Sequence, residues 1–397
     1  MNQKRVLFLG GAYSQVPIIM EAKNRGWYII TCDYLPDNPG HKYADEYYNV
    51  STTDFENVLE VAKKTKPDFI VAYASDPAAP TASWVSEQLG LPSNSYKSVQ
   101  TLAEKDLFRK FLKENGFNTP NAVSIEEKED IEKIKVLKLP IIIKPTDSSG
   151  SKGVTRVDKE EGKIKAFEYA LKFSRNKRVI AEEFIDSNGN QLQGDGFVEN
   201  SKLIFSYLGD HHYNKGINPF VPYSTTWPSQ ISDYELQLVN KELSRAIELS
   251  GFKNGAINIE VRINKDGDIY IMEIGPRSGG NFVPQVINYS TGFNMVEGIL
   301  KNINGETITI DNNFETKPSA YYVIHSPIDG LLDSVEIKDE LKPFVKEYHQ
   351  YIHPDGQVKS FQGANAAIGI LLLTFSTIKV MNYYISNMNE FVVVNLR

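Results

Sequence analysis

Two glutamates, Glu260 and Glu273, have the type and spacing expected of ligands to a metal ion. They lie in the segment 255–280, which reads as two alternating strands joined at Asp266-Gly267. This dipeptide readily takes the positive φ angles of a two-residue hairpin turn. A hairpin brings residues of its two strands face to face, so the pattern predicts that the two acids share a site.

The predicted turn determines which residues face each other. Lys265 would pair with Asp268, and counting outward places Glu260 directly opposite Glu273, with Cβ atoms about 5 Å apart. Two carboxylates at that separation repel each other unless a positive group lies between them. A divalent cation suits the position because hard cations take carboxylate oxygens and keep phosphate oxygens as further ligands. A surface hairpin with solvated acids is the alternative.

A lysine followed by a Gly/Ser-rich loop is a candidate phosphate-binding element. The short predicted strand 139–144 ends in Lys144, which would place a point charge beside phosphate oxygens. The next loop has small side chains and many accessible N–H groups that suit the same oxygens. It departs from the P-loop pattern G-x-x-x-x-G-K-[ST], so a flexible polar loop without a ligand is the alternative. The loop residues are Asp147, Ser148, Ser149, Gly150, Ser151, Lys152 and Gly153.

Two further segments contain charged residues that need partners. The pattern over 98–120 predicts one amphipathic helix with Lys105 near its start. The helix dipole disfavours a cation there, and a bound phosphate would remove that penalty. The predicted strand 178–185 ends in an acidic pair whose burial requires partners: Glu182 and Glu183, followed by Phe184 and Ile185. Glu182 could accept a hydrogen bond from an adenine amine, and an acidic pair at a strand edge is the alternative.

The first hundred residues predict a parallel sheet with crossover helices, because short apolar strands alternate with helical patterns. Gly10-Gly11 at the first strand end allows close approach of a ligand, but the full G-x-G-x-x-G pattern is absent. Asp33 is therefore read as a solvated carboxylate at a strand end rather than a ribose ligand. Strands are expected near 6–9, 27–32 and 69–72, and helices near 16–25 and 55–64.

Composition and charge exclude several classes of protein. The 397-residue chain has a formal net charge of −7, which argues against nucleic-acid binding by bulk electrostatics. Cys32 is the only cysteine, so no intrachain disulfide can form and a reducing compartment is expected. Residues 1–11 lack a signal-peptide pattern, and the longest apolar run, 364–375, is too short to span a bilayer. We therefore expect a cytoplasmic protein without nucleic-acid or membrane partners.

The order of these elements resembles that of the ATP-grasp superfamily, in particular its carboxylate–amine ligases and carbamoyl-phosphate-synthase-like members. The resemblance implies a mixed α/β and α+β fold. A pre-ATP-grasp Rossmann-like domain would cover 1–97, an ATP-grasp domain 98–310 with a lid subdomain at about 120–185, and a small C-terminal α+β domain 311–397. The matching elements are Lys105 on a helix, Lys144 at a strand end, the Gly/Ser loop, the hinge 182–185, and Glu260 and Glu273 followed by Arg277.

The resemblance also implies ATP and Mg²⁺ or Mn²⁺ as cofactors. Lys105 and Lys144 would hold ATP phosphates under the loop 148–153, and Arg277 would steady an acyl phosphate. Glu182 would accept from the adenine amine, with backbone groups of Glu183 and Ile185 binding the ring nitrogens. The implied nucleotide site comprises Lys105, Lys144, Ser148, Ser149, Gly150, Ser151, Gly153, Glu182, Glu183, Phe184, Ile185 and Gln191. The implied metal ligands are Glu260 and Glu273, and the implied catalytic residues are Arg277 and Lys144.

Two positions depart from the family pattern. Gln191 stands where the family commonly has a glutamate that holds the ribose, and a neutral amide can still donate and accept. The family pattern Glu-x-Asn-Pro-Arg appears here with Gly275 in place of the asparagine that usually ligates the second magnesium. By the predicted register Asn258 lies opposite Gly275, and we hypothesise that Asn258 restores this ligand. Water is the alternative, since magnesium tolerates several waters.

The expected function is ATP-dependent ligation, in which a carboxylate is activated as an acyl phosphate and joined to an amine, with release of ADP and phosphate. Amino acids are one candidate class for both small-molecule substrates. Activation of bicarbonate is the alternative enzymatic function, and a non-catalytic nucleotide-binding module is the alternative outside enzymes.

His211, His212 and His325 are candidates for the acceptor pocket, with structural or solvated histidines as the alternative. A homodimer is the assembly left open.

Overall fold

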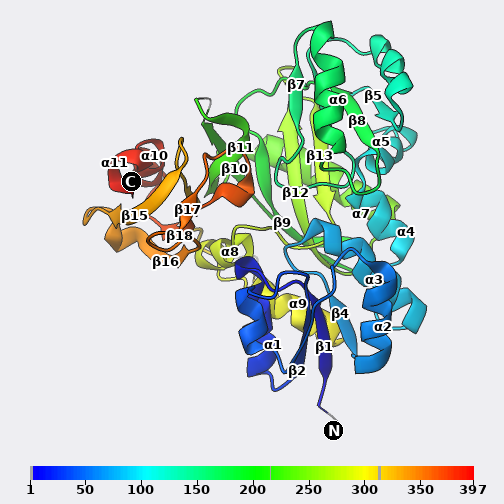
Figure 1. The fold of residues 1–397 in the computed structure, drawn as a ribbon, viewed down its shortest axis with the longest axis vertical. Coiled ribbons are helices and arrows are strands. Elements are labelled where there is room, and N and C mark those ends of the chain that lie inside the picture. The colour runs from blue at the N-terminus through cyan, green and yellow to red at the C-terminus, as the bar shows by residue number, and fades with distance from the viewer. Residues whose placement is uncertain (1–2, 215, 312–313) are drawn as a thin grey trace.

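The N-terminal part of the chain forms the predicted parallel sheet, with strand order β3-β2-β1-β4. The computed structural model describes residues 3–214, 216–311 and 314–397, so Met1, Asn2, Lys215, Asn312 and Asn313 lie outside it. Helix α1 covers one face of the sheet, and α2 and α3 cover the other (Figure 1). The elements are β1 (Arg5–Leu9), η1 (Tyr13–Gln15), α1 (Val16–Asn24), β2 (Tyr28–Cys32), η2 (Pro39–Tyr43), β3 (Glu46–Tyr48), α2 (Phe55–Thr65), β4 (Phe69–Val71), η3 (Asp76–Ala78) and α3 (Ala79–Leu89).

Strand β1 is buried on both faces, which explains its unbroken apolar sequence. Val6 and Phe8 pack in one hydrophobic cluster, whereas Leu7 and Leu9 pack in another on the opposite side. Parallel strands covered by helices on both faces read as continuous apolar runs rather than alternating ones. The predicted alternation of strands and helices is confirmed.

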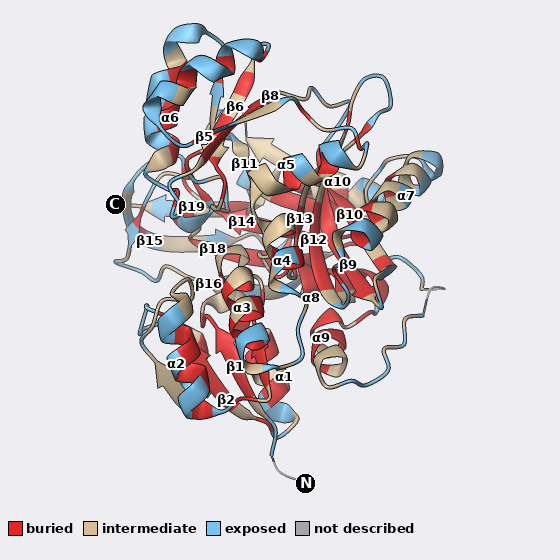
Figure 2. Ribbon diagram, turned by 90° about the vertical axis from the view of Figure 1, so that its right-hand side faces the viewer, coloured by how far each residue is buried: buried red, intermediate tan, exposed pale blue. Residues whose placement is uncertain are grey.

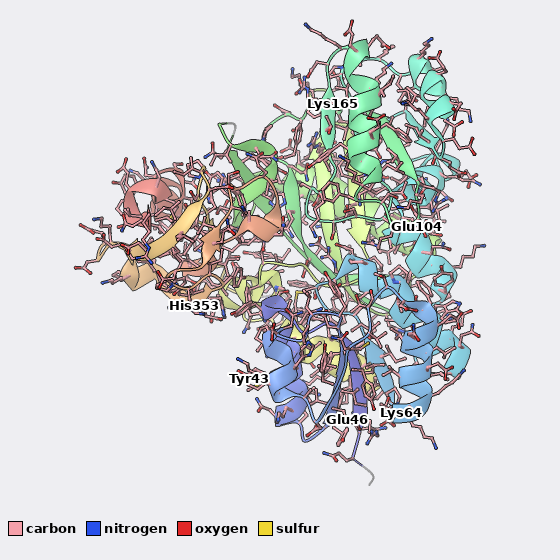
Figure 3. The ribbon with its side chains drawn as sticks, viewed as in Figure 1. Tyr43, Glu46, Lys64, Glu104, Lys165 and His353 are labelled. Atoms are coloured by element: carbon pink, nitrogen blue, oxygen red, sulfur yellow. The ribbon has the colours of Figure 1, made fainter. Side chains whose placement is uncertain are left out.

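The single helix predicted over 98–120 is wrong, because two helices occupy that range. Helix α4 (Tyr96–Ala103) ends at Glu104, which takes extended angles of φ −92° and ψ 119°, and α5 (Lys105–Glu114) follows directly. Glu104 lies at this break (Figure 3), where its carboxylate is paired with the guanidinium of Arg178. This tertiary ion pair overrides the local helical propensity. The break places Lys105 in the first turn of α5.

A small antiparallel sheet, with strand order β5-β8-β6-β7, lies above the junction of α4 and α5 (Figure 1). Its apolar side packs on α6 through residues such as Ile141, Ile143 and Phe167. This unit occupies the range expected for the lid. Its elements are β5 (Ala122–Ile125), η4 (Lys128–Val136), β6 (Ile141–Pro145), β7 (Thr155–Val157), η5 (Glu160–Gly162), α6 (Lys163–Leu171) and β8 (Val179–Glu183).

The largest sheet of the described residues has eight antiparallel strands in the order β13-β12-β9-β10-β11-β14-β18-β16. Helices α4, α5 and α7 cover one face of its buried strands (Figure 2). Helices α8 and α9 pack on the other face against the N-terminal sheet. The elements are β9 (Leu192–Glu199), β10 (Lys202–Asn214), β11 (Asn218–Trp227), α7 (Asp233–Ser250), β12 (Gly255–Ile263), β13 (Ile269–Gly275), α8 (Val283–Thr291), α9 (Met295–Ile303), β14 (Ser319–Ile324), β16 (Val345–Gln350) and β18 (Gly369–Thr374).

The C-terminal residues extend this large sheet and add a smaller one. Strand β14 pairs with β11, so the sheet runs across the domain boundary expected at 310/311, and the predicted boundaries stay a prediction. Within the described residues, no helix is long and apolar enough to cross a membrane. The smaller sheet has the order β17-β15-β19. The remaining elements are β15 (Gly330–Ile337), η6 (Lys342–Phe344), β17 (Gln357–Val358), η7 (Ala364–Ala366), α10 (Ile378–Ser386), α11 (Met388–Phe391) and β19 (Val392–Leu396).

Candidate active site

The hairpin β12–β13 places Glu260 opposite Glu273 as predicted, but the turn that achieves this differs from the predicted one. The Asn264 N–H donates to the carbonyl of Asp268, so the loop contains three residues rather than two. This loop shifts the register by one residue, pairing Val261 with Ile271. A β-bulge at Met272 then shifts the register back before the two glutamates. Two deviations from the expected hairpin therefore cancel, and the predicted pairing of Lys265 with Asp268 is wrong.

The two glutamates form a concentration of negative charge that suits a cation. Burial and the neighbouring Glu273 carboxylate raise the pKa of Glu260 to about 7. The Lys105 Nζ lies 3.5 Å from Glu273 Oε2, and the Gln191 amide donates to Glu260 Oε2 at 2.6 Å. Among the described residues, no group of three or more His, Cys, Asp or Glu side chains could hold a metal ion. Two carboxylates nevertheless fit Mg²⁺, which keeps waters and phosphate oxygens as its other ligands.

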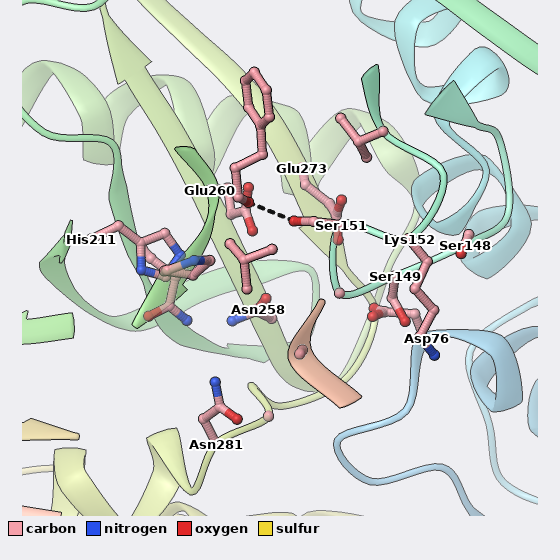
Figure 4. A pocket seen from close by; sticks show the side chains of 18 of the residues that line it. Asp76, Ser148, Ser149, Ser151, Lys152, His211, Asn258, Glu260, Glu273 and Asn281 are labelled. Carbon is pink, nitrogen blue, oxygen red and sulfur yellow. Dashed lines mark hydrogen bonds between the residues drawn. The ribbon is translucent and has the colours of Figure 1, made fainter. Parts of the chain in front are cut away.

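Asn258 lies on the same face of β12 as Glu260, two residues away, and faces Gly275 as predicted. Its Nδ2 donates to the carbonyl of Gly194 at 3.0 Å and to Asp195 Oδ1 at 2.8 Å. Both bonds use the amide nitrogen, so the Oδ1 oxygen is left for a ligand. Figure 4 shows Asn258 and Glu260 in the same pocket.

Asp195 is a site residue to which the sequence assigned no role. It is fully buried on β9 and accepts hydrogen bonds from Asn258 and from the Gly279 N–H at 2.8 and 2.9 Å. It therefore fixes both the amide beside the glutamates and the loop that follows Arg277. Burial raises its pKa to about 6, against the effect of these bonds. The only signal in the sequence was an acid between two strand glycines.

Arg277 is held by Asp76, a residue 201 positions earlier in the chain. The Arg277 Nε donates to Asp76 Oδ1 at 2.6 Å, and its Nη2 donates to Oδ2. A Cβ atom on Gly275 would lie 2.9 Å from Asp76 Oδ1, so the absence of a side chain at 275 makes room for this pair. Burial raises the pKa of Asp76, but the Arg277 charge outweighs it and holds the pKa below its usual range. Sequence analysis missed Asp76, whose place before Pro77 looks like an ordinary helix start.

Lys144 contacts Glu182 rather than standing free. Its Nζ lies 2.7 Å from Glu182 Oε2, while the Arg109 Nε lies 2.9 Å from Oε1. Burial alone would raise the pKa of Glu182, but these two cations lower it to about 2. The carboxylate expected to bind the adenine amine thus neutralises two buried cations, and adenine binding stays a prediction. Arg109 was missed because it lies within the helical pattern of α5.

The Gly/Ser loop lies over the site and contacts both sides of it. The Lys105 Nζ donates to the Ser148 carbonyl at 2.8 Å, and the Ser151 hydroxyl donates to the Phe220 carbonyl at 2.6 Å. Figure 4 shows Ser148, Ser149, Ser151 and Lys152 along this loop. A Cβ on Gly150 would lie 3.3 Å from the side chain of Ala364 in the C-terminal part. The loop has the position of a lid.

The hinge 182–185 and Gln191 make contacts that limit their predicted roles. The N–H groups of Glu183 and Phe184 donate to the carbonyls of Asn121 and Pro140. The carbonyl is therefore the backbone group of Glu183 that is left for an adenine ring. The Arg262 guanidinium donates to the Ile185 carbonyl at 2.9 Å and to Gln191 Oε1 at 2.8 Å. With its Nε2 bonded to Glu260, Gln191 bridges the metal-binding and hinge residues, and its ribose contact stays a prediction.

One cavity of about 840 Å³ collects most of the predicted residues, a volume typical of small-molecule sites. Of the predicted set, Gly153 does not line it, and of the three candidate histidines only His211 does. The predicted residues that line the cavity are Lys105, Lys144, Ser148, Ser149, Gly150, Ser151, Glu182, Glu183, Phe184, Ile185, Gln191, Asn258, Glu260, Glu273 and Arg277.

His211 is neutral throughout the physiological pH range. It is 5% exposed, its Nδ1 lies 2.6 Å from Thr225 Oγ1, and burial lowers its pKa to about 3. His212, 2.9 Å from Thr226 Oγ1, has its pKa lowered by burial to about 4. Neither group can act as a cation near pH 7.

The buried His211 predicts a loss of stability in mild acid. Because its folded pKa lies below the ordinary 6.5, the unfolded chain binds a proton below pH 6.5 that the folded chain excludes. Between pH 7 and pH 5 the wild type should lose about 2 kcal/mol more free energy of unfolding than His211→Gln. Urea titrations at the two pH values measure this, with the exposed His353→Gln (Figure 3) as control. Equal losses in wild type and His211→Gln would contradict it.

The chain is similar in sequence to known proteins. Residues 137–285 match the family model of the ATP-grasp domain. The chain is 23% identical over 366 residues to the carbamoyl phosphate synthase large chain of Caldanaerobacter subterraneus, covering 89% of this chain and 33% of that protein. It is 29% identical over 281 residues to a formate-dependent phosphoribosylglycinamide formyltransferase of Prochlorococcus marinus, covering 69% and 70%. This chain thus spans about a third of the synthase.

Solved structures share the fold over the whole chain. An L-amino acid ligase from Bacillus licheniformis has a TM-score of 0.84 at 21% identity, and each chain is covered completely. A phosphoribosylglycinamide synthetase from Anaerococcus prevotii has a TM-score of 0.78 at 20% identity, again with complete coverage. The family model thus identifies an ATP-grasp domain at residues 137–285, and the similarity in sequence and fold to the proteins named above extends over most of the chain.

Proposed function

We propose that the protein is an ATP-dependent ligase that activates a carboxylate as an acyl phosphate and joins it to an amine. The observation that carries this proposal is the convergence of two lysines, two opposed glutamates and one arginine on a single cavity. Bound magnesium-ATP would supply the phosphoryl group that converts the substrate carboxylate into an acyl phosphate with a good leaving group. The relatives and structural neighbours named above include a carbamoyl phosphate synthase large chain and an L-amino acid ligase.

The charged side chains of the cavity suit a crowded set of phosphate oxygens. The Lys105 and Lys144 side chains are 15% and 12% exposed, and their present partners, Ser148 and Glu182, lie at 2.8 and 2.7 Å. Donors fixed in a site with little water act strongly on developing negative charge. Glu260 and Glu273, with Asn258, would hold magnesium, which would neutralise phosphate oxygens when bound. Arg277, which is rigid and always charged, suits an acyl phosphate or an oxyanion.

The lid loop is suited to the exclusion of water from an acyl phosphate. Its bonds to Lys105 and to the Phe220 carbonyl hold it against the cavity that it lines. Glycines at 150 and 153 have φ angles of +65° and +75°, which side-chain-bearing residues rarely adopt. A loop of this kind can open for substrates and close before the reaction.

We further propose amino acids as the substrate class, because the solved structure that matches the whole chain with a TM-score of 0.84 is an L-amino acid ligase. This step rests on analogy of fold rather than on the site.

We also propose the domain boundaries expected from the sequence and a cytoplasmic location. The proposed partners are small molecules only, and a homodimer is the assembly to test.

Asn258→Ala tests the proposed metal set. The substitution is expected to raise about tenfold the magnesium concentration that supports half-maximal ADP binding, because it removes an amide oxygen beside the carboxylates. Calorimetric titration of the full chain with ADP at several magnesium concentrations measures this. Asp195→Asn is the comparison variant, since it alters the partner of Asn258 while keeping the Asn258 oxygen. An unchanged magnesium requirement in Asn258→Ala would favour water as the ligand.

Phosphate release tests the function itself. The protein would be incubated with magnesium-ATP and a panel of amino acids, singly and in pairs, and with bicarbonate. We expect phosphate release that requires both a carboxylate and an amine. Release stimulated by bicarbonate alone would support the carboxylating alternative, and the absence of release with every substrate would support a nucleotide-binding module.

A further inference from the structure

We propose that the substrate presents an uncharged apolar or aromatic group to one set of walls of the cavity and carries no phosphate. This inference rests on the proposed ligase function and specifies the class of its substrate. The relevant walls, here called the acceptor compartment, come from the β1–α1 loop and from residues 321–367. They include Tyr13, Tyr321, Val323, Tyr351, Phe361 and Ala367.

The charged residues of the cavity lie outside the acceptor compartment. Among the described residues, the charged side chains that line the cavity belong to the lid, to α5, and to β12, β13 and the residues after β13. Asp76 is the remaining one. No described lining residue of the β1–α1 loop or of 321–367 is acidic, basic or a histidine. A buried charged group requires an opposite charge or several hydrogen bonds. A charged substituent would find no counter-ion in this compartment.

The walls of the acceptor compartment offer aromatic and aliphatic surface. Tyr13 and Tyr351, from opposite ends of the chain, pack with ring centroids 4.7 Å apart. Phe361 is 2% exposed and packs on His325, at 4.6 Å between centroids. Val323 is 3% exposed. Surfaces of this kind gain free energy by covering apolar groups of a ligand.

The β1–α1 loop is the place where a phosphate would otherwise be expected, because a strand end and a helix start meet there. Two of its N–H donors are already used. The Gly11 N–H donates to Asp33 Oδ2 at 3.2 Å, and the Ala12 N–H donates to Gln15 Oε1 at 2.8 Å. Asp33, only 7% exposed, would place its own negative charge behind any bound phosphate. Pro17 also removes one N–H from the first turn of α1. The loop therefore disfavours a phosphorylated substrate.

Matched ligands test the proposal directly. Dissociation constants would be measured by calorimetry on the full chain with magnesium-ADP for leucine against glutamate and lysine, and for tyrosine against O-phosphotyrosine. Leucine and tyrosine are expected to bind at least about tenfold more tightly than their charged counterparts. Tighter or equal binding of the charged compounds would overturn the proposal, as would the absence of binding by both leucine and tyrosine.

A charge placed in the acceptor compartment gives an independent test. Ala367→Arg is expected to weaken leucine binding about tenfold and to strengthen O-phosphotyrosine binding, because the guanidinium supplies the absent counter-ion. Ala122→Arg, on β5 and outside the cavity lining, is the matched control and should leave both constants unchanged. Unchanged preferences in Ala367→Arg would contradict the assignment of the compartment. Preferential binding of apolar ligands without phosphate release would reject the ligase function while leaving the compartment's selectivity intact.

Discussion

Glu273→Gln is expected to reduce phosphate release at least about 100-fold while leaving the protein folded. Glu273 faces Glu260 across the hairpin and lies 3.5 Å from Lys105. The amide keeps the shape of the side chain but removes the charge that would hold magnesium at the phosphates, and loss of such electrostatic stabilisation costs about two to three orders of magnitude in turnover. Phosphate release at saturating ATP measures the effect.

The same substitution should also leave a signature that does not depend on turnover. It removes one of two mutually repelling, partly buried acids, so the thermal midpoint without magnesium should stay constant or rise. The dependence of ADP binding on magnesium should weaken. Glu114→Gln, an exposed residue of α5, is the control and should behave as wild type. Near-normal turnover of Glu273→Gln would defeat the metal assignment.

The hairpin shows why a correct pairing can follow from an incorrect turn. Alternation along 255–280 fixed which side chains share a face, since the period of a strand is two. The three-residue loop and the bulge at Met272 are additional irregularities that cancel in register. The Arg109 guanidinium donates to the Met272 carbonyl at 2.9 Å, which gives the bulge a partner that no local pattern could indicate.

The fold and the order of elements could be predicted because they depend on local periodicity and spacing. The mixed α/β and α+β class, the parallel N-terminal sheet and the ATP-grasp domain at residues 137–285 are confirmed. The helix break at Glu104 was missed because its cause is an ion pair with Arg178, 74 residues away. Contacts of that kind are fixed by tertiary packing and leave no periodic signal.

The charged partners within the site were the least predictable part. Lys144, Glu273 and Arg277 were identified from their own segments, but their partners Glu182, Lys105 and Asp76 are distant in sequence. The sequence indicated that Gly275 lacks an expected side chain. Only the structure shows that Asp76 occupies the space beside it. A departure from a family pattern is therefore explained by Asp76 of η3, in the N-terminal part of the chain.

Arg277→Met is expected to lower both turnover and stability, for two separable reasons. It removes the fixed cation proposed to act on the acyl phosphate, so turnover should fall at least about 100-fold. It also leaves Asp76, whose side chain is only 18% exposed, without its guanidinium partner, and this loss is expected to cost about 3 kcal/mol of unfolding free energy. Urea titration and phosphate release measure the two effects.

A second substitution separates catalysis from structure at this pair. In Asp76→Asn/Arg277→Met the buried acid is also gone, so the free energy of unfolding should return to within about 1 kcal/mol of wild type. Turnover should stay at the level of Arg277→Met, because the cation is still missing. If the double variant instead regained turnover together with stability, Arg277 would be a structural partner of Asp76 and its catalytic role would be wrong. Arg277→Lys should recover little of the turnover, since an ammonium cannot reproduce the two parallel bonds that Arg277 makes to Asp76.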